Sequence, residues 1–186
     1  MPSHSPLTTL DARYSGQNAQ AVPWPDALAR LEKAELFWVS TVRPDGRPHV
    51  TPVVAVWMDG AFYFSSGPGE QKSRNLASGR HCAVTTGCNS WDDGFDIVLH
   101  GEAVVVRDRA VLQRVADAFL AKYGSAWTFE VDGDGTFRGH GHGVSLVYEV
   151  TPAQALGFGK GDPFSHTRWD FTAGPAPSGP AGAPAS

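Results

Sequence analysis

Two spacings of apolar residues divide the central part of this 186-residue chain into predicted strands and helices. Aromatic and β-branched residues fill residues 36–42, 49–57 and 61–66, and the turn sequences Pro-Asp-Gly and Asp-Gly separate these three runs. Such runs between short turns favour strands that follow one another as an antiparallel meander. Similar runs predict further strands at residues 82–86, 95–108 and 144–150.

Three other segments have apolar residues at helical spacing or capping residues in place of these β-branched runs. Asp26 is the expected N-cap of a short helix that ends at Glu35. Residues 70–78 form a second predicted helix after a Gly-Pro-Gly loop, and residues 109–123 form a third with apolar residues at helical spacing. The combination predicts a β-rich α+β fold, a six-stranded antiparallel barrel with short helices packed outside.

The two ends of the chain lack this patterning. We expect a flexible N-terminal arm at residues 1–21 and one folded domain at residues 22–171. Residues 172–186 contain only Ala, Gly, Pro, Ser and Thr, which cannot offset the entropy lost on ordering. We therefore expect this Ala/Gly/Pro-rich tail to be disordered.

Composition excludes several classes of protein. The chain has 15 Lys and Arg against 19 Asp and Glu, and this acidic balance disfavours a nucleic-acid partner. No apolar run approaches the ~20 residues that span a bilayer, and the first residues lack a signal-peptide core. Cys82 and Cys88 form neither a CxxC motif nor a disulfide framework. We expect a cytoplasmic protein with no membrane partner.

One segment has the residue types of a phosphate site. Ser65 and Ser66 precede the Gly-Pro-Gly loop, and Lys72 and Arg74 lie in the first turns of the next predicted helix. Phosphate groups bind hydroxyls, a helix N-terminus and a nearby cation. An ordinary loop–helix corner with solvated Lys72 and Arg74 has the same pattern, so the residues alone leave both interpretations open.

The ordered sequences RPDGRPHVTPV and DGAFYFSSGPGEQKSRNL resemble the split β-barrel flavin and deazaflavin oxidoreductases, the superfamily that contains pyridoxamine 5′-phosphate oxidase. The closing sequence SHTRWDF at residues 165–171 is also similar to this superfamily, and the resemblance covers about residues 36–171. It implies the FMN-binding split-barrel fold and a homodimer with one tricyclic cofactor in each of two clefts at the interface.

The resemblance also implies which residues contact the cofactor. Three strand residues would line the ring edge, two serines and a lysine would hold the phosphate, and two residues near the C-terminus would reach the pocket of the same or the other subunit. The cofactor-binding residues implied in this way are Thr51, Pro52, Val53, Ser65, Ser66, Lys72, Arg74, Asn75, Arg168 and Trp169. The loops at residues 88–95 and 127–143 would form the substrate pocket.

Two departures bear on the cofactor. Pyridoxamine 5′-phosphate oxidases have Ser-Arg-Lys where this chain has Glu70, Gln71 and Lys72, and an arginine on the strand that reads HVTPVV here. The K-x-R-N-L sequence at residues 72–76 is instead similar to the branch that uses the deazaflavin coenzyme F420. We therefore favour F420 over FMN.

The function that follows is hydride transfer between bound F420 and a small electron-poor organic acceptor. One alternative is an FMN-binding protein similar to pyridoxamine 5′-phosphate oxidase, or a flavin reductase. Others are a non-catalytic binder of flavin, deazaflavin or haem, and a barrel that has lost its cofactor. The catalytic residues stay unassigned, since Tyr63, His49 and His100 are candidate general acids by residue type alone.

Other candidate motifs are weak. His140 and His142 could lie on one side of an extended segment, but no third or fourth ligand follows and glycines flank both. The acidic sequence at residues 132–135 lacks the glycine and the glutamate of a calcium loop at the required positions. We expect no metal site, and we expect both cysteines to be inert.

Overall fold

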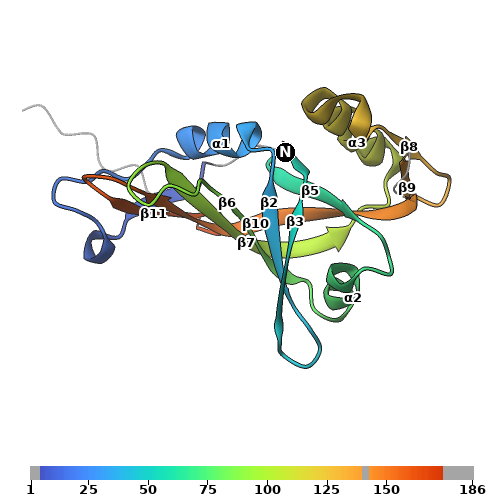
Figure 1. Cartoon of the computed structure of the whole chain (residues 1–186), viewed down its shortest axis with the longest axis horizontal. Helices are drawn as coiled ribbons and strands as arrows, with labels where there is room; N and C mark the ends of the chain where they lie inside the picture. Colours follow the sequence, from blue (N-terminus) through green and yellow to red (C-terminus); the bar gives the residue numbers. More distant parts are fainter. Residues whose placement is uncertain (1–4, 140–142, 174–186) are drawn as a thin grey trace, which may run out of the picture.

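The body of the protein is an antiparallel sheet with three helices packed against it (Figure 1). The computed structural model describes residues 5–139 and 143–173. The helices are α1 (Trp24–Lys33), α2 (Gln71–Ser78) and α3 (Arg109–Tyr123), with short 3-10 turns η1 (Ala12–Tyr14) and η2 (Gly124–Trp127). The strands are β1 (Leu7–Leu10), β2 (Phe37–Val42), β3 (Pro48–Val53), β4 (Ala55–Met58), β5 (Ala61–Ser66), β6 (His81–Thr86), β7 (Phe95–Val105), β8 (Phe129–Val131), β9 (Phe137–Gly139), β10 (Gly143–Gly159) and β11 (Ser165–Asp170).

The long strand β10 organises the sheet. Its residues 146–150 pair with β5 and its residues 154–159 pair with β11, while β7 pairs with it along 148–159. Since β7 occupies one edge of β10, β5 and β11 follow each other along the opposite edge. The register of β10 with β7 shifts between Pro152 and Gln154, where β11 replaces β5 on the opposite edge of β10. This arrangement confirms the α+β class and the split barrel that the resemblance implies.

The sheet has 11 strands in the described residues, whereas the sequence predicted six. The predicted strand at 144–150 continues to Gly159, because small and apolar residues maintain the alternation past the shift. The segment expected to be an arm contributes β1, which pairs with β11. Part of the loop predicted at 127–143 forms β9, which pairs with β10. Residues 174–186, most of the predicted tail, lie outside the described residues.

The predicted strand at residues 49–57 divides at Val54 into β3 and β4. β3 pairs with β2, and β4 turns away to pair with β5. The Tyr123 hydroxyl from α3 lies at this break, 3.0 Å from the Ala55 amide nitrogen and 2.8 Å from its carbonyl oxygen. The Lys122 ammonium donates to the same carbonyl at 3.0 Å. Side chains of α3 therefore hydrogen-bond the backbone of Ala55, where the strand changes its pairing partner from β2 to β5.

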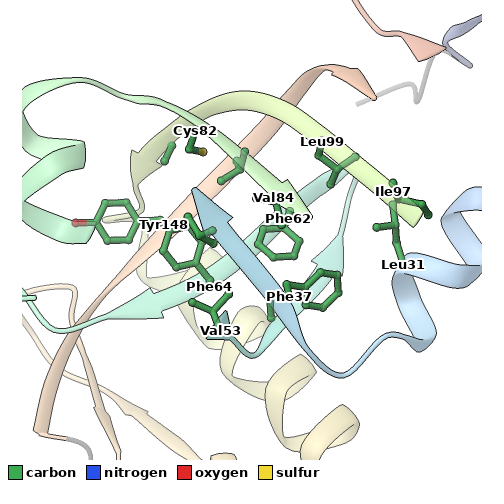
Figure 2. Close-up of a cluster of buried hydrophobic side chains, with 14 of the residues drawn as sticks. Leu31, Phe37, Val53, Phe62, Phe64, Cys82, Val84, Ile97, Leu99 and Tyr148 are labelled. Carbon is green, nitrogen blue, oxygen red and sulfur yellow. The ribbon is translucent and has the colours of Figure 1, made fainter. Parts of the chain in front are cut away.

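The inner face of the sheet forms the main core (Figure 2). Phe37, Phe62 and Phe64 pack there with strand residues of β6 and β7, and α1 covers this core with Ala27 and Leu31. A second cluster lies between α3 and the β8–β9 hairpin, centred on Phe119 and Phe137. Helix α3 has the predicted bounds. Helix α1 begins two residues before the predicted cap, because Pro23 precedes it and Pro25 favours its first turn.

The described residues leave the outer face of the sheet uncovered. Trp38, Val42 and Val50 are 40%, 58% and 54% exposed on adjacent strands. The outer face also contains a hollow of about 810 Å³, lined by residues of β2, β6, β7 and β10 that include His81, His100 and Glu102. Trp38, Val42 and Val50 therefore form an exposed apolar patch on the outer face.

Among the described residues, none of the helices has the length and apolar character needed to cross a membrane.

Candidate functional site

A cavity of about 190 Å³ lies where β3, the end of β5, the start of α2 and the η2–β8 segment meet. It contains five of the ten residues that the sequence predicted as cofactor contacts: Pro52, Val53, Ser65, Ser66 and Lys72. Tertiary structure thus places residues 52–53 beside residues 65–72, which are separated by the β4–β5 hairpin. The remaining lining residues are Val54, Glu70, Trp127, Phe129 and Ser145.

Lys72 is the cation of this cavity. It lies in the first turn of α2 and is only 6% exposed, so its ammonium needs a partner. Its Nζ donates to Glu70 Oε2 in an ion pair, and the other carboxylate oxygen of Glu70 accepts from the Gly67 amide at 2.7 Å. Burial opposes ionisation of Glu70, but these two donors outweigh it and lower the pKa of the carboxyl.

The two serines end β5 on opposite faces, as neighbours in a strand do. The Ser66 hydroxyl accepts a hydrogen bond of 2.7 Å from the Ser73 hydroxyl of α2 and lies 3.4 Å from the Gly67 carbonyl oxygen. Ser65 is half-buried opposite Val147 of β10. The cavity therefore combines serine hydroxyls and a buried ammonium at the start of α2, and these are groups that bind phosphate esters.

Three other predicted residues lie near α2 but do not line the cavity. Asn75 is fully buried, donates to the Thr41 hydroxyl at 2.9 Å and accepts from the Gln71 amide at 2.7 Å. Arg74 is exposed and donates to the Gly69 carbonyl at 2.8 Å. Thr51 Oγ1 is buried and has no hydrogen-bond partner among the described residues. Asn75 and Arg74 hold α2 and its preceding loop in position, and their contact with a cofactor stays a prediction.

Arg168 and Trp169 lie at the other end of the sheet. Trp169 is fully buried, with its indole N–H donated to the Val22 carbonyl at 3.0 Å and its ring against Trp24. Arg168 is exposed, 3.7 Å from Asp170. Neither residue lines this chain's cavity, which takes only Ser145 from the neighbouring strand β10, at the end of β10 that does not pair with β11. A contact across a subunit interface stays a prediction.

Sequence reasoning did not assign Glu70 or Ser145 to the site. Glu70 stands at the first of the two positions where the chain departs from the Ser-Arg-Lys triplet, and that departure was the available signal. Trp127 and Phe129 come from the 127–143 loop that was predicted as a pocket wall. The other predicted wall, residues 88–95, does not line this cavity.

The candidate general acids do not line the cavity either. Tyr63 is buried and donates to Glu149 at 2.8 Å, and burial together with this carboxylate raises the pKa of the phenol. His49 lies on β3, where burial and then the charges of Arg43 and Lys72 lower the pKa of its imidazole. His100 lines the hollow of the outer face. In the part of the chain that the structure describes, none of these three candidate acids is placed in the cavity.

Metal binding and thiol chemistry are the other chemistries that the sequence analysis considered. No group of three His, Cys, Asp or Glu side chains in residues 5–139 and 143–173 is arranged to hold a metal. His140 and His142 lie outside those residues. Burial raises the pKa of the Cys82 thiol to about 11, which disfavours the thiolate. Cys88 is exposed, and its thiol donates to the Asp93 carbonyl at 3.2 Å.

Comparisons with known proteins agree with this architecture. The family model described as pyridoxamine 5′-phosphate oxidase matches residues 24–157. No curated protein was found to match the sequence.

Three solved structures with the same fold illustrate its range. A conserved hypothetical protein from Mycobacterium tuberculosis shares 14% identity at a TM-score of 0.61, over 90% of this chain and 97% of that one. An FAD binding protein from Mycobacterium smegmatis shares 18% sequence identity at a TM-score of 0.54, over 80% of this chain and 97% of that one. A heme binding protein from M. smegmatis shares 15% sequence identity at a TM-score of 0.57, over 72% of this chain and 52% of that one. This chain therefore spans about half the length of the heme binding protein. At these identities the likeness shows the fold alone.

Proposed function

Because this chain belongs to the pyridoxamine 5′-phosphate oxidase family, we propose that it is an oxidoreductase that binds a flavin-type cofactor beside Lys72. The observation that supports this proposal is the buried ammonium of Lys72 next to Ser65 and Ser66 in one cavity. A cation and hydroxyls held at a helix N-terminus suit the phosphate that FMN and F420 share. Coenzyme F420 is the favoured cofactor, on the K-x-R-N-L sequence of α2.

The residues present fit a phosphate with one opposing feature. The ammonium and the hydroxyls would attract the anion, whereas the Glu70 carboxylate occupies the same ammonium. The cavity of about 190 Å³ is also smaller than the ~300 Å³ at which ligand pockets begin. This chain's cavity would hold the phosphate end, and the remainder of the cofactor would need the adjoining outer face, where Pro52 pairs with Trp38.

The second part of the proposal is a homodimer built on the outer face. Trp38, Val42 and Val50 form an exposed apolar surface beside the cavity, and a second copy of the chain would bury it. A two-fold dimer would supply the missing wall of each cofactor site. Analytical ultracentrifugation of the native protein and of Val50→Lys tests this: we expect a dimer and a weakened dimer, and a native monomer would contradict the proposal.

A reduced deazaflavin or flavin supplies a hydride to an electron-poor acceptor. The described residues would bind and orient that cofactor, with Lys72 at its phosphate and Trp127 and Phe129 excluding water from the cavity. The proposed acceptor is a small electron-poor organic molecule such as a quinone or an activated alkene. The alternatives are an FMN-dependent oxidase or flavin reductase, and a non-catalytic binder of flavin, deazaflavin or haem.

Parallel fluorescence titrations of the apo-protein with F420 and with FMN test the cofactor. Preferential binding of F420 supports the deazaflavin reductase, and preferential binding of FMN moves the protein to the flavin branch. Lys72→Met keeps the buried aliphatic stem, and we expect it to weaken binding at least tenfold. Lys33→Met, which removes an exposed lysine of α1, is the matched control. Binding of neither cofactor would overturn the proposal.

Turnover separates the enzyme from a binder. Loss of F420H2 absorbance with menadione or cyclohexenone as acceptor is expected for the enzyme. Tight cofactor binding without turnover of either acceptor class would favour the non-catalytic alternative.

A further inference from the structure

An aromatic cleft lies at η1, the C-terminal end of β10 and the start of β11, whereas the candidate cofactor cavity takes Ser145 from the other end of β10. The cleft has a volume of about 440 Å³ and is lined by Tyr14, Phe158, Gly159, Phe164, Ser165 and His166. This volume is within the range of small-molecule sites, and none of its lining residues lines the cofactor cavity. The proposed function does not use this cleft.

The ring of His166 is the central feature of the cleft. It stacks on Phe158 at a centroid distance of 4.6 Å and an interplanar angle of 26°, and the Tyr14 ring lies 6.0 Å away. His166 Nε2 is shut off from solvent and has no hydrogen-bond partner among residues 5–139 and 143–173. A buried polar atom without a partner is rare and costly, and a ligand group can satisfy it.

Hydrogen bonds between the N-terminal segment and β11 hold the walls of the cleft in place. The His166 amide donates to Ser15 Oγ at 3.0 Å, and its carbonyl accepts from the Asp11 amide at 2.8 Å. The Gly16 amide donates to the Phe164 carbonyl at 2.8 Å. Tyr14 lies between these anchors on the three-residue turn η1 and is 62% exposed, so its ring is the wall that can move to admit a ligand.

Two ion pairs lie beside the cleft. Arg13 donates to both carboxylate oxygens of Asp11, at 2.9 and 2.7 Å. Lys160, which follows Gly159, is 3.0 Å from the Asp96 carboxylate. The cleft thus offers aromatic faces and no unpaired charge among the residues that line it, and movement of the Tyr14 ring would open His166 Nε2 to a ligand.

We propose that this cleft binds a small, uncharged, planar aromatic molecule whose edge has one hydrogen-bonding group for His166 Nε2. The ring of the ligand would stack against the aromatic walls. Its edge group would donate to Nε2 or accept from it, according to the tautomer of His166. The site is separate from the phosphate corner, so either proposal can fail without the other.

Three bicyclic probes of similar size test this site by NMR titration of the ¹⁵N-labelled full chain. Indole offers a donor, isoquinoline offers an acceptor, and 1-methylindole offers neither. We expect one of the first two to bind about tenfold more tightly than 1-methylindole, because it recovers a buried hydrogen bond. The same probe should shift the His166 ring nitrogen resonance. Equal affinities for the three probes, or no binding, would overturn the proposal.

Variants of the walls sharpen the test. His166→Phe keeps the stack on Phe158 and removes the nitrogen, and it should abolish the preference among the probes while retaining 1-methylindole binding. Tyr14→Ala should weaken binding of all three. Trp91→Ala is the matched control, since Trp91 is 88% exposed and lies outside the cleft lining. A preference that survives in His166→Phe, or binding that depends on Trp91, would contradict the proposal.

Discussion

The Lys72 ammonium and the Glu70 carboxylate form an ion pair within the lining of the candidate cofactor cavity. The same carboxylate accepts from the Gly67 amide. Glu70 therefore occupies a cation and an amide that a bound phosphate would use, and it brings negative charge to that place. One of the chain's own side chains therefore competes with a phosphate for these two groups.

We expect Glu70→Gln to increase the affinity for FMN and for inorganic phosphate several-fold, because the substitution removes a competing carboxylate and its repulsion of the anion. Fluorescence and calorimetric titrations measure this change. Glu32→Gln alters the net charge equally at an exposed position of α1, outside the cavity lining, and should leave both affinities unchanged. An unchanged or reduced affinity in Glu70→Gln would show that the carboxylate does not compete with the phosphate.

The Tyr123 hydroxyl is expected to stabilise the change of ladder at Ala55. Tyr123→Phe removes the hydrogen bonds to the amide and carbonyl of Ala55, which are 3.0 and 2.8 Å long. We expect a loss of ~2 kcal/mol in the free energy of unfolding, because the Ala55 amide loses its hydroxyl partner. Urea denaturation measures it. Tyr14→Phe, on an exposed ring, is the control and should change stability little.

Lys122 should make stability rise with pH between 7 and 9. Burial lowers the pKa of its ammonium from 10.5 to about 8, while Glu35 and Glu32 oppose the shift. The unfolded chain therefore binds this proton up to higher pH than the folded chain, so the unfolded state holds more protons in this interval and raising the pH favours folding.

Lys122→Met keeps the aliphatic stem and removes the titration. Between pH 7 and 9, we expect the free energy of unfolding of the native protein to rise by ~1 kcal/mol relative to that of the variant. Denaturation curves at a series of pH values give the pH dependence of the free energy of unfolding for both proteins. Parallel curves would mean that the ammonium titrates alike in the folded and unfolded chains.

Gly157 should tolerate no side chain. A Cβ atom there would lie 2.4 Å from Trp169 Cη2 and 2.5 Å from Phe95 Cζ, both in the packed end of the sheet. We expect Gly157→Ala to cost more than ~2 kcal/mol, because neither ring can move without disturbing the core. A Cβ at Gly69 would meet nothing within 4 Å, so Gly69→Ala is the matched control. Equal melting temperatures of the two variants would contradict this packing.

The local elements followed from the sequence where neighbouring residues determine them. The apolar spacing of residues 109–123 predicted α3 with its observed bounds, because Asp108 caps the helix and Gly124 ends it. The hairpin turns and the β-branched runs likewise predicted β2, β5 and β6 to within one residue. The resemblance on top of this spacing identified the family and the split barrel.

Strand pairing between residues far apart in the sequence determined the remaining strands. Nothing adjacent to Val54 in the sequence indicates that β3 and β4 part there, because the hydroxyl that supports the break comes from Tyr123. The length of β10 depends on β11 and β9 as partners, and β1 exists as a strand only because β11 offers it an edge. Segments with weak patterning of their own adopt the conformation that their partners satisfy.

The candidate site divides in the same way. The sequence by itself determined that residues 65–74 have the residue types of a phosphate site, because those types have a fixed chemistry, and its resemblance to the family implied a cofactor-ring contact at residues 51–53. Only the tertiary structure decided that Pro52, Val53, Ser65, Ser66 and Lys72 share one cavity, whereas Asn75 is engaged within the fold and Trp169 lies in the core. The reason is physical: side-chain chemistry is local, but burial, pairing and distance depend on residues far apart in the chain.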